Sequence, residues 1–572
     1  MKQQLRKYRM FLAGLFVGVI SILSVSYDHY FEVSKNLEIF STLFKELDIY
    51  YVDEINPGDL TKTGIDAMLE SLDPYTNYIP ESEMEDHRLS TTGQYGGIGA
   101  AVSKRNEYVV ISEPYEGYPA QKSGLMAGDK IVEVNGQSVK GKSTDDVVKL
   151  LRGAPNSTVQ ISVLREAKKI DFNVLREEVK IKNVPYYGVL DNNIGYIKLK
   201  GFTNNAGNDV KDALNALKQN NKLDGVILDL RGNPGGLLRE AINVVNVFVE
   251  RNQLVVSTKG KVDEWNKSYK TLNMPVDRDM PLVILVNRGS ASASEIVSGT
   301  IQDLDRGIII GQRTFGKGLV QSTRPLVYNT QLKVTTSKYY IPSGRCIQAL
   351  DYSKRNPDGS VGTIADSLRN AFKTKIGRVV YDGGGVYPDI QLKSRKYSNV
   401  LRTLLAKYLI FDFATQYRSA HPNISTAREF KLTDQEYEGF LSFLKGKNYE
   451  YTTESEKLLE EFKAISEKEK YFDSIQQEYN ALLEKKKQTK SNDIIKFKDE
   501  IKEFLIDEIV SRYYYQQGRI EASLMVDQEV REAISVLRDT KRYNEILSPS
   551  FVIKGTDEEE AGSDMDLEME DE

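Results

Sequence analysis

Histidine is scarce in this chain. Of 572 residues only three are histidine, His29, His87 and His421, and none lies between residues 88 and 420. That same stretch holds the short apolar runs, glycine turns and serine clusters that are typical of a catalytic domain. A Ser-His-Asp triad cannot be built inside it, so a serine nucleophile there would need another base. A lysine can serve if burial makes its amine neutral near the working pH.

Cysteine is scarcer still, since Cys346 is the single cysteine. One cysteine can form no intrachain disulfide and no cysteine-based metal cluster. A serine nucleophile with a lysine base requires no metal ion and no organic cofactor.

The body of the chain also lacks an excess of either charge. The formal net charge is -5, but Asp557–Glu572 holds ten acids and no base, and without it 77 bases face 72 acids. Such a balance predicts no nucleic-acid partner. We interpret residues 551–572 as an acidic, solvated, disordered tail; an acidic docking segment is the alternative.

The N-terminus is basic and then apolar. Four basic residues precede an uncharged stretch from Met10 to Tyr27. This order predicts a signal peptide or a membrane anchor within residues 1–30, with the rest of the chain exported. Because the small-residue pattern around Ser24-Val25-Ser26 is a poor cleavage site, an uncleaved anchor is favoured over a removed signal. A buried helix of a soluble domain is the alternative.

Two regions with different sequence patterns follow. Residues 31–92 have helical periodicity, for example in Leu37, Phe40 and Leu43, and predict a helical cap. Its second, short helix is expected at about 65–72, where Asp73-Pro74 ends it. Residues 93–178 alternate short strands with glycine turns, and one helix is expected at 144–151.

The second of these regions resembles a PDZ domain. The resemblance rests on the loop Gly96-Gly97-Ile98-Gly99 together with Ala127-Gly128-Asp129 and Val134-Asn135-Gly136. Glycines let backbone N–H groups converge on a peptide carboxylate, and an exposed sheet edge accepts the peptide as an added strand. An unrelated small barrel is the alternative.

Residues 179–395 alternate apolar strands and amphipathic helices, which predicts an α/β core. Strands are expected at 194–199, 226–230, 282–286 and 307–310, and helices at 209–218, 237–249 and 294–304. Residues 396–550 turn helical and highly charged, with apolar stripes around Leu458–Ile465 and Phe472–Leu482. Such stripes usually form an intramolecular core, and a homodimer or partner contact is the alternative.

Ser292 is expected at the junction between the strand 282–286 and the following helix, where unpaired N–H groups favour a developing negative charge. Ser290, Ser292 and Ser294 could each instead be helix-capping residues. Lys317 lies in a glycine-flanked loop 25 residues after Ser292. Its amine could accept the serine proton only if burial lowers its pKa.

Asp229–Gly236 follows another apolar strand and opens a helix. We interpret it as one wall of an oxyanion hole, with N–H groups from Gly235 or Gly236 on one side and from Ala293 on the other. The segment fits neither the Gly-x-Gly-x-x-Gly nor the Walker pattern, which argues against a nucleotide site.

Three motifs behind the PDZ-like region, Arg231–Gly236, Gly289–Glu295 and Phe315–Gln321, resemble those of the carboxyl-terminal processing peptidases, a Ser-Lys family of serine proteases. The resemblance extends over roughly residues 35–395 and includes Leu72–Thr76 and Tyr339–Gly344. It implies a crotonase-like α/β protease core with an inserted PDZ domain, a helical N-terminal cap and a helical C-terminal domain.

The same resemblance implies roles for individual residues. Ser292, the middle serine of its cluster, would be the nucleophile, Lys317 the general base and Gln321 the residue that positions the lysine. Arg152 matches the place of a PDZ arginine that senses substrate; an ordinary charge at a helix C-terminus is the alternative. The expected partners are protein C-termini, the expected location is the periplasmic side of the bacterial inner membrane, and a homodimer through the C-terminal helices is a further expectation.

Two functions are alternatives to a Ser-Lys protease. One is an inactive PDZ adaptor or chaperone on a protease scaffold, which cleavage sensitive to Ser292→Ala would exclude. The other is a crotonase-like acyl-transfer enzyme, in which a PDZ domain would have no evident role.

Overall fold

The computed structural model describes residues 30–191, 193–356, 360–364 and 368–553. The predicted signal or anchor at 10–27 and most of the predicted acidic tail lie outside these residues. Within the described ranges, no helix combines the length and the apolar character needed to cross a bilayer.

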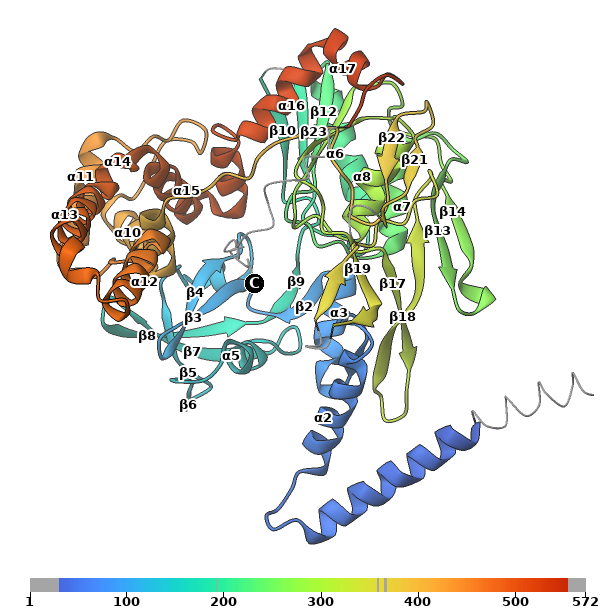
Figure 1. The fold of residues 1–572 in the computed structure, drawn as a ribbon, viewed down its shortest axis with the longest axis horizontal. Helices are drawn as coiled ribbons and strands as arrows, with labels where there is room; N and C mark the ends of the chain where they lie inside the picture. Colours follow the sequence, from blue (N-terminus) through green and yellow to red (C-terminus); the bar gives the residue numbers. More distant parts are fainter. Residues whose placement is uncertain (1–29, 192, 357–359, 365–367, 554–572) are drawn as a thin grey trace, which may run out of the picture.

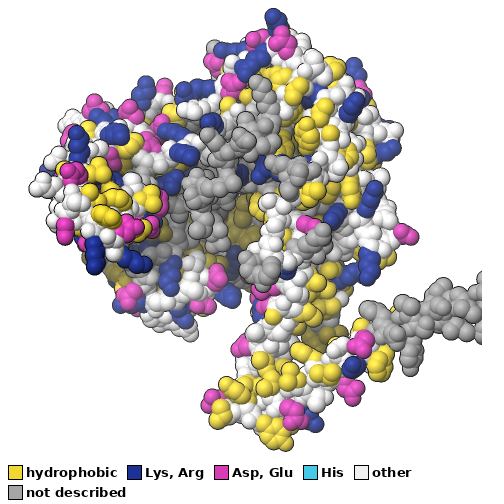
Figure 2. All heavy atoms as spheres, viewed as in Figure 1, with side chains coloured by type: hydrophobic (Ala, Val, Ile, Leu, Met, Phe, Trp, Pro, Cys, Tyr) yellow, Lys and Arg dark blue, Asp and Glu magenta, His cyan; other side chains and the backbone are white. Residues whose placement is uncertain are grey.

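The N-terminal cap is helical, as predicted. Residues 30–50 form one helix, followed by α2 (Pro57–Glu70), β1 (Asn77–Ile79), η1 (Glu81–Glu83) and α3 (Met84–Thr92). The apolar stripe of the first helix is not buried: Leu37 is 65% exposed and Phe40 52%. Figure 2 shows hydrophobic side chains gathered over this helix and α2.

The PDZ-like region is an antiparallel sheet of order β3-β4-β5-β7-β8, with β6 added to β5. The expected helix 144–151 is present as α5 (Thr144–Leu151). Strands β2 (Gln94–Gly97) and β9 (Glu177–Lys180) pair where the chain enters and leaves the region. The remaining elements are β3 (Ala100–Arg105), β4 (Tyr108–Pro114), α4 (Pro119–Lys122), β5 (Lys130–Val134), β6 (Gln137–Ser138), β7 (Thr158–Arg165) and β8 (Lys168–Leu175).

A six-stranded sheet of order β10-β11-β12-β15-β16-β23 forms the α/β core. All pairs are parallel except β10 with β11. The predicted strands and helices are confirmed within a few residues. The strands are β10 (Tyr186–Leu190), β11 (Ile194–Lys198), β12 (Gly225–Asp229), β15 (Leu282–Val286), β16 (Ile308–Gly311) and β23 (Ile390–Gln391).

Alternate residues of these strands face two separate apolar layers. Leu228 and Ile284 join the layer under α6 (Ala206–Asn220), α7 (Leu238–Phe248) and α8 (Ala293–Asp303). Ile227 and Val283 join the opposite layer, which α16 (Gln528–Arg538) and α17 (Thr540–Ile546) cover. Figure 1 shows α16 and α6–α8 on opposite sides of the sheet.

A second sheet, antiparallel throughout and of order β1-β18-β13-β14, joins the cap to the core, with β17 also paired to β18. Its strands from the core region are β13 (Leu254–Gly260), β14 (Lys267–Lys270), β17 (Leu319–Pro325) and β18 (Gln331–Tyr340), and η2 (Asp263–Trp265) lies between β13 and β14. Two small hairpins follow, β19 (Leu350–Arg355) with β20 (Val361–Thr363) and β21 (Ala371–Lys373) with β22 (Val379–Tyr381).

The C-terminal helices divide into two packing units. The first has its own apolar core, whereas α16 and α17 belong to the core sheet. The predicted stripe on α12 and α13 is largely exposed, although Phe472 and Tyr479 are buried. The helices of the first unit are α9 (Asn399–Ala406), α10 (Leu409–Ala420), α11 (Asp434–Leu444), α12 (Glu454–Lys468), α13 (Phe472–Ser491), α14 (Asp493–Lys496) and α15 (Lys498–Ser523).

Candidate active site

Ser292 lies where β15 passes into α8, as the sequence predicts. Five buried apolar residues form β15, and Ser292 is the N-cap residue of the helix that follows. Its backbone has φ 52° and ψ -109°, which is unusual for a residue other than glycine. A strained backbone of this kind costs about 1–3 kcal/mol and is often found at functional sites.

The three neighbouring serines differ in what their hydroxyls do. Ser290 donates to the carbonyl of Leu230 at 2.8 Å, and Ser294 donates to the carbonyl of Asn233 at 2.8 Å; both side chains are fully buried. Ser292 is half-buried, and its hydroxyl donates to no acceptor among the described residues. Ser290 and Ser294 therefore fix the turn, while the Ser292 hydroxyl remains available.

The Glu295 carboxylate joins the serine turn to the lysine loop. One of its oxygens accepts the backbone N–H groups of Ser292 at 2.8 Å and of Lys317 at 2.9 Å. The other accepts Thr314 Oγ1 at 2.6 Å and Gly316 N–H at 2.7 Å. Burial raises the pKa of Glu295 to about 7, although these four hydrogen bonds favour the ionised form. Sequence reasoning missed this residue; the available signal was the Ser-x-x-Glu spacing of a capping box.

Lys317 is half-buried, and its pKa is lowered to about 8 by burial and by the nearby Lys333 cation. Glu295 and Asp73 act in the opposite direction. The Lys317 Nζ lies 4.0 Å from the centre of the Tyr75 ring, which the cap contributes. A lysine base requires a pKa that burial has lowered, and Lys317 meets this requirement.

Gln321 lies on β17, four residues after Lys317, but its amide donates to Thr335 Oγ1 of β18 at 3.1 Å. Within the described part of the chain, no hydrogen bond joins Gln321 to Lys317. The Thr76 hydroxyl lies 3.4 Å from Thr335 Oγ1 and 3.1 Å from Asp73. Gln321 thus connects β17 to the cap segment that faces Lys317.

Tyr339 is a further residue whose part in the site was not assigned from the sequence. Its hydroxyl lies 2.6 Å from the carbonyl oxygen of Lys317 and 3.2 Å from that of Ser292. The side chain is buried, so this hydroxyl and Glu295 fix the two backbone segments from opposite directions.

The glycine loop lies directly against the serine turn. A Cβ on Gly235 would be 2.9 Å from the Ser292 Cβ and from the Ala293 nitrogen, and Gly235 has φ 104°. The Gly235 N–H donates to Asn233 Oδ1 at 2.9 Å. The N–H groups of Gly236 and Ala293 have no hydrogen-bond partner among the described residues, so these two are the unengaged donors of the predicted oxyanion hole.

Of the predicted loop Gly96-Gly97-Ile98-Gly99, Gly96 and Gly97 belong to β2 and pair with Glu178 and Glu177 of β9. Only Ile98-Gly99 lies between β2 and β3, and β3 is the edge strand of its sheet. Gly99 has φ 72°, and a Cβ there would be 2.4 Å from the Tyr118 Cβ, so the turn requires glycine. The predicted open edge is present, and α5 packs beside β3. This is the geometry that accepts a peptide as an added strand.

Arg152 is the C-cap residue of α5, and its guanidinium forms an ion pair with Asp86 of α3. It also lies 5.1 Å from the centre of the Tyr95 ring. In this structure Arg152 therefore connects the PDZ-like region to the cap.

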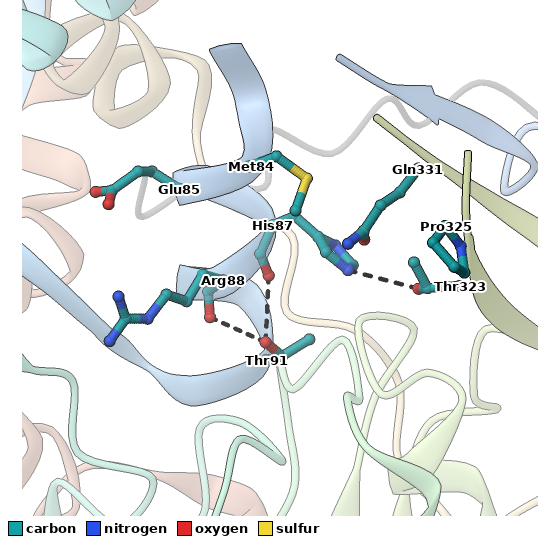
Figure 3. Close-up of a pocket in the computed structure, with 8 residues that line it drawn as sticks. All are labelled: Met84, Glu85, His87, Arg88, Thr91, Thr323, Pro325 and Gln331. Carbon is teal, nitrogen blue, oxygen red and sulfur yellow. Dashed lines mark hydrogen bonds between the residues drawn. The ribbon is translucent and has the colours of Figure 1, made fainter. Parts of the chain in front are cut away.

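A cavity of about 560 Å³ separates α3 from the β17–β18 hairpin. Figure 3 shows His87 pointing toward Thr323, with Nε2 3.5 Å from Oγ1, while Glu85 and Arg88 point away from β17. Thr323 is two residues beyond Gln321, on the same face of the strand. Residues 88–420 contain no histidine, but the fold places His87 of the cap next to β17. Neither Ser292 nor Lys317 lines this cavity.

Three family descriptions match successive parts of the chain. They are Peptidase family S41 at residues 193–357, a PDZ domain at 110–165, and the C-terminal helical domain of a probable PDZ-protease at 400–537. The helical match runs from α9 to α16 and ends before α17.

Known proteins agree with these matches. The carboxy-terminal-processing protease of Bartonella bacilliformis is 34% identical over 354 residues, 60% of this chain and 81% of the relative. A probable CtpA-like serine protease of Staphylococcus aureus is 37% identical over 317 residues, 54% of this chain and 62% of the relative. Among solved structures, the photosystem II D1 C-terminal processing protease is 29% identical with a TM-score of 0.34 and covers 62% of this chain and 92% of its own.

Proposed function

The chain belongs to peptidase family S41, as a carboxy-terminal-processing serine protease with a PDZ domain, and from this premise we propose that it is an endopeptidase with a Ser292–Lys317 dyad. Its substrates are proteins captured by their C-termini. The observation that carries the proposal is the Glu295 oxygen, which accepts the N–H groups of both Ser292 and Lys317 and so holds the two segments together.

This geometry supports the following sequence of proton transfers. Neutral Lys317 takes the Ser292 hydroxyl proton as the Oγ attacks the scissile carbonyl carbon. The resulting oxyanion accepts hydrogen bonds from Gly236 and Ala293 N–H, while Gly235 allows the loop to approach the serine. Lys317 then gives its proton to the leaving amine as the C–N bond breaks. Water, deprotonated by Lys317, hydrolyses the acyl-enzyme and restores the Ser292 hydroxyl.

We assign substrate capture to the groove between β3 and α5. The open β3 edge would pair with an extended C-terminal segment, and the loop Gly96–Gly99 would receive its carboxylate. Arg152 would contribute a positive charge at the end of α5 once it is released from Asp86.

The basic and apolar sequence up to Tyr27 supports export to the bacterial cell envelope, with the catalytic part on the periplasmic side of the inner membrane. The exposed side chains of Leu458, Phe462 and Ile465 on α12 support a homodimer through the C-terminal helices. Unengaged donors at a strand-to-helix turn support a crotonase-like core.

Cleavage of an unstructured protein by the purified chain tests the dyad. We expect Ser292→Ala and Lys317→Ala each to abolish cleavage and to leave peptide binding unchanged, whereas Lys338→Ala, an exposed lysine on β18, has no effect. Near-normal turnover by Lys317→Ala would exclude the dyad. A wild-type chain that binds peptides but does not cleave them would instead be an adaptor.

A further inference from the structure

Two acidic side chains near the end of the chain reach the loop 231–236, which we call the oxyanion loop. Asp527 Oδ2 lies 2.8 Å from Arg231 Nη2, and Arg231 Nη1 donates to Glu529 Oε2. The same guanidinium donates to Asp229, with 3.0 Å from Nε and 2.6 Å from Nη2. The side chains of Arg231, Asp527 and Glu529 are only 16–17% exposed, so these contacts are shielded from solvent.

The acids are held in place by the helix that carries them. Asp527 is the N-cap residue of α16, and its Oδ1 accepts the N–H groups of Glu529 at 2.9 Å and Val530 at 3.0 Å, so Oδ2 is directed to Arg231. Helix α16 is anchored on the core sheet by four buried side chains, Val530, Ala533, Val536 and Leu537.

The charges in this cluster depend on one another. Arg231 and Lys198 provide two cations, and Asp229, Asp527 and Glu529 provide three carboxylates. Glu529 is the hydrogen-bond acceptor found for Arg231 Nη1 among the described residues, so removing its charge leaves a shielded guanidinium beside a neutral and weaker acceptor. Asp229 still binds the guanidinium, but with fewer carboxylates around it the shielded charge is less well compensated. Such a charge shifts toward solvent or another acceptor, which would displace the backbone that carries it.

The displacement would pass to the oxyanion donors because the loop is short and tethered. Lys198 Nζ donates to the Arg231 carbonyl at 2.9 Å, and Gly232 N–H donates to Asn287 Oδ1 at 2.8 Å. Asn233 then bonds both the Leu199 carbonyl and the Gly235 N–H, each at 2.9 Å. Gly236, the proposed oxyanion donor, directly follows Gly235. Hydrogen bonds and peptide bonds therefore connect Arg231 to Gly236 without a gap.

We propose that Asp527 and Glu529, at the start of α16, are positioning residues for the peptidase reaction: they hold Arg231 and thereby set the oxyanion loop against Ser292. The inference rests on the proposed Ser-Lys mechanism with Gly236 as an oxyanion donor. It assigns the last part of the C-terminal helical region an effect on the chemical step that acts through Arg231 and is separate from any role in folding or substrate capture.

The test uses the full-length chain with two charge-removing, shape-preserving variants, Glu529→Gln and the double variant Asp527→Asn/Glu529→Gln. Asparagine can still cap α16, so the helix start is preserved. The control is Glu532→Gln, which removes a charge from the same helix where the partner is Arg542. Cleavage of an unstructured reporter gives kcat and KM, and a peptide boronic acid, which forms a tetrahedral adduct with the serine, gives an inhibition constant.

We expect kcat to fall about 10- to 100-fold in the double variant, with KM within about twofold of wild type, because only the transition state uses the oxyanion donors. The boronic acid should bind more weakly by a similar factor, and the control should match wild type. A kcat within twofold of wild type, or a rise in KM alone, would overturn the inference. If the double variant does not fold, Glu529→Gln is judged by the same criteria. A wild-type chain without serine-dependent cleavage would refute the proposed function instead.

Discussion

The proposed lysine base predicts a distinctive pH dependence, and its magnitude follows from the surroundings of Lys317. The pKa of Lys317 is lowered to about 8, first by burial and then by Lys333. An amine with this pKa is neutral in about 10% of molecules at pH 7, against about 0.03% for an unperturbed lysine. Between pH 8.5 and pH 6 the neutral fraction falls about 80-fold, so kcat/KM should fall by at least this factor.

Glu295 affects the same acidic side, or limb, of the pH–activity profile, where kcat/KM falls as the pH is lowered. Burial raises its pKa to about 7, and a protonated carboxyl can no longer accept all four of its hydrogen bonds. Activity should therefore fall more steeply below pH 7 than one titrating group allows. Lys333→Met removes a cation near Lys317, which raises the pKa of Lys317, so the limb should move to higher pH and activity at pH 7 should fall.

The assay is kcat/KM for a reporter peptide from pH 5.5 to pH 9.5, with His87→Gln as the control. The pKa of His87 is lowered from 6.5 by burial and by Lys333, so a histidine base would place the limb below pH 6.5. We expect a midpoint near pH 8 in wild type and in His87→Gln. A midpoint below pH 6.5 that disappears in His87→Gln would refute the lysine base.

Three further predictions follow from individual contacts. Tyr339→Phe removes a hydroxyl that contacts the carbonyls of both proposed catalytic residues, and should lower kcat about 10-fold with little change in melting temperature; unchanged kcat would contradict this. Arg378→Leu leaves the buried Asp389 without its partner at 2.6 Å, and should lower the free energy of unfolding by about 3–5 kcal/mol in chemical denaturation; a loss under about 1 kcal/mol would argue against it. Arg152→Ala should raise KM for substrates with a free C-terminus, whereas Asp86→Ala, which frees the arginine, should not; equal effects would assign the pair to structure alone.

The α/β core was predictable because its local signals agree with one another. The strand 282–286 is a continuous apolar run, as expected where both faces are buried, and all five of its residues are buried. The helix 144–151 begins after the capping residue Ser143, so its boundaries could be read directly from the sequence.

The long-range contacts were not predictable from one sequence. An amphipathic stripe specifies that a helix has an apolar face but not which surface covers it. Helix α16 packs on the core sheet about 300 residues away, whereas the stripe of residues 30–50 has no such surface in the described chain. Glu295 fits a capping pattern locally, and only the fold brings the Lys317 loop to its carboxylate.

We propose that Ser292 attacks the substrate with Lys317 as its base, and the site of acylation tests this most directly. Rapid quenching of the wild-type chain with a slowly hydrolysed peptide ester, followed by mass spectrometry of its fragments, measures where the acyl group is attached. We expect an adduct on Ser292 that forms faster as pH rises through about 8 and is absent in Lys317→Ala. An adduct on another residue, or unchanged acylation in Lys317→Ala, would contradict it.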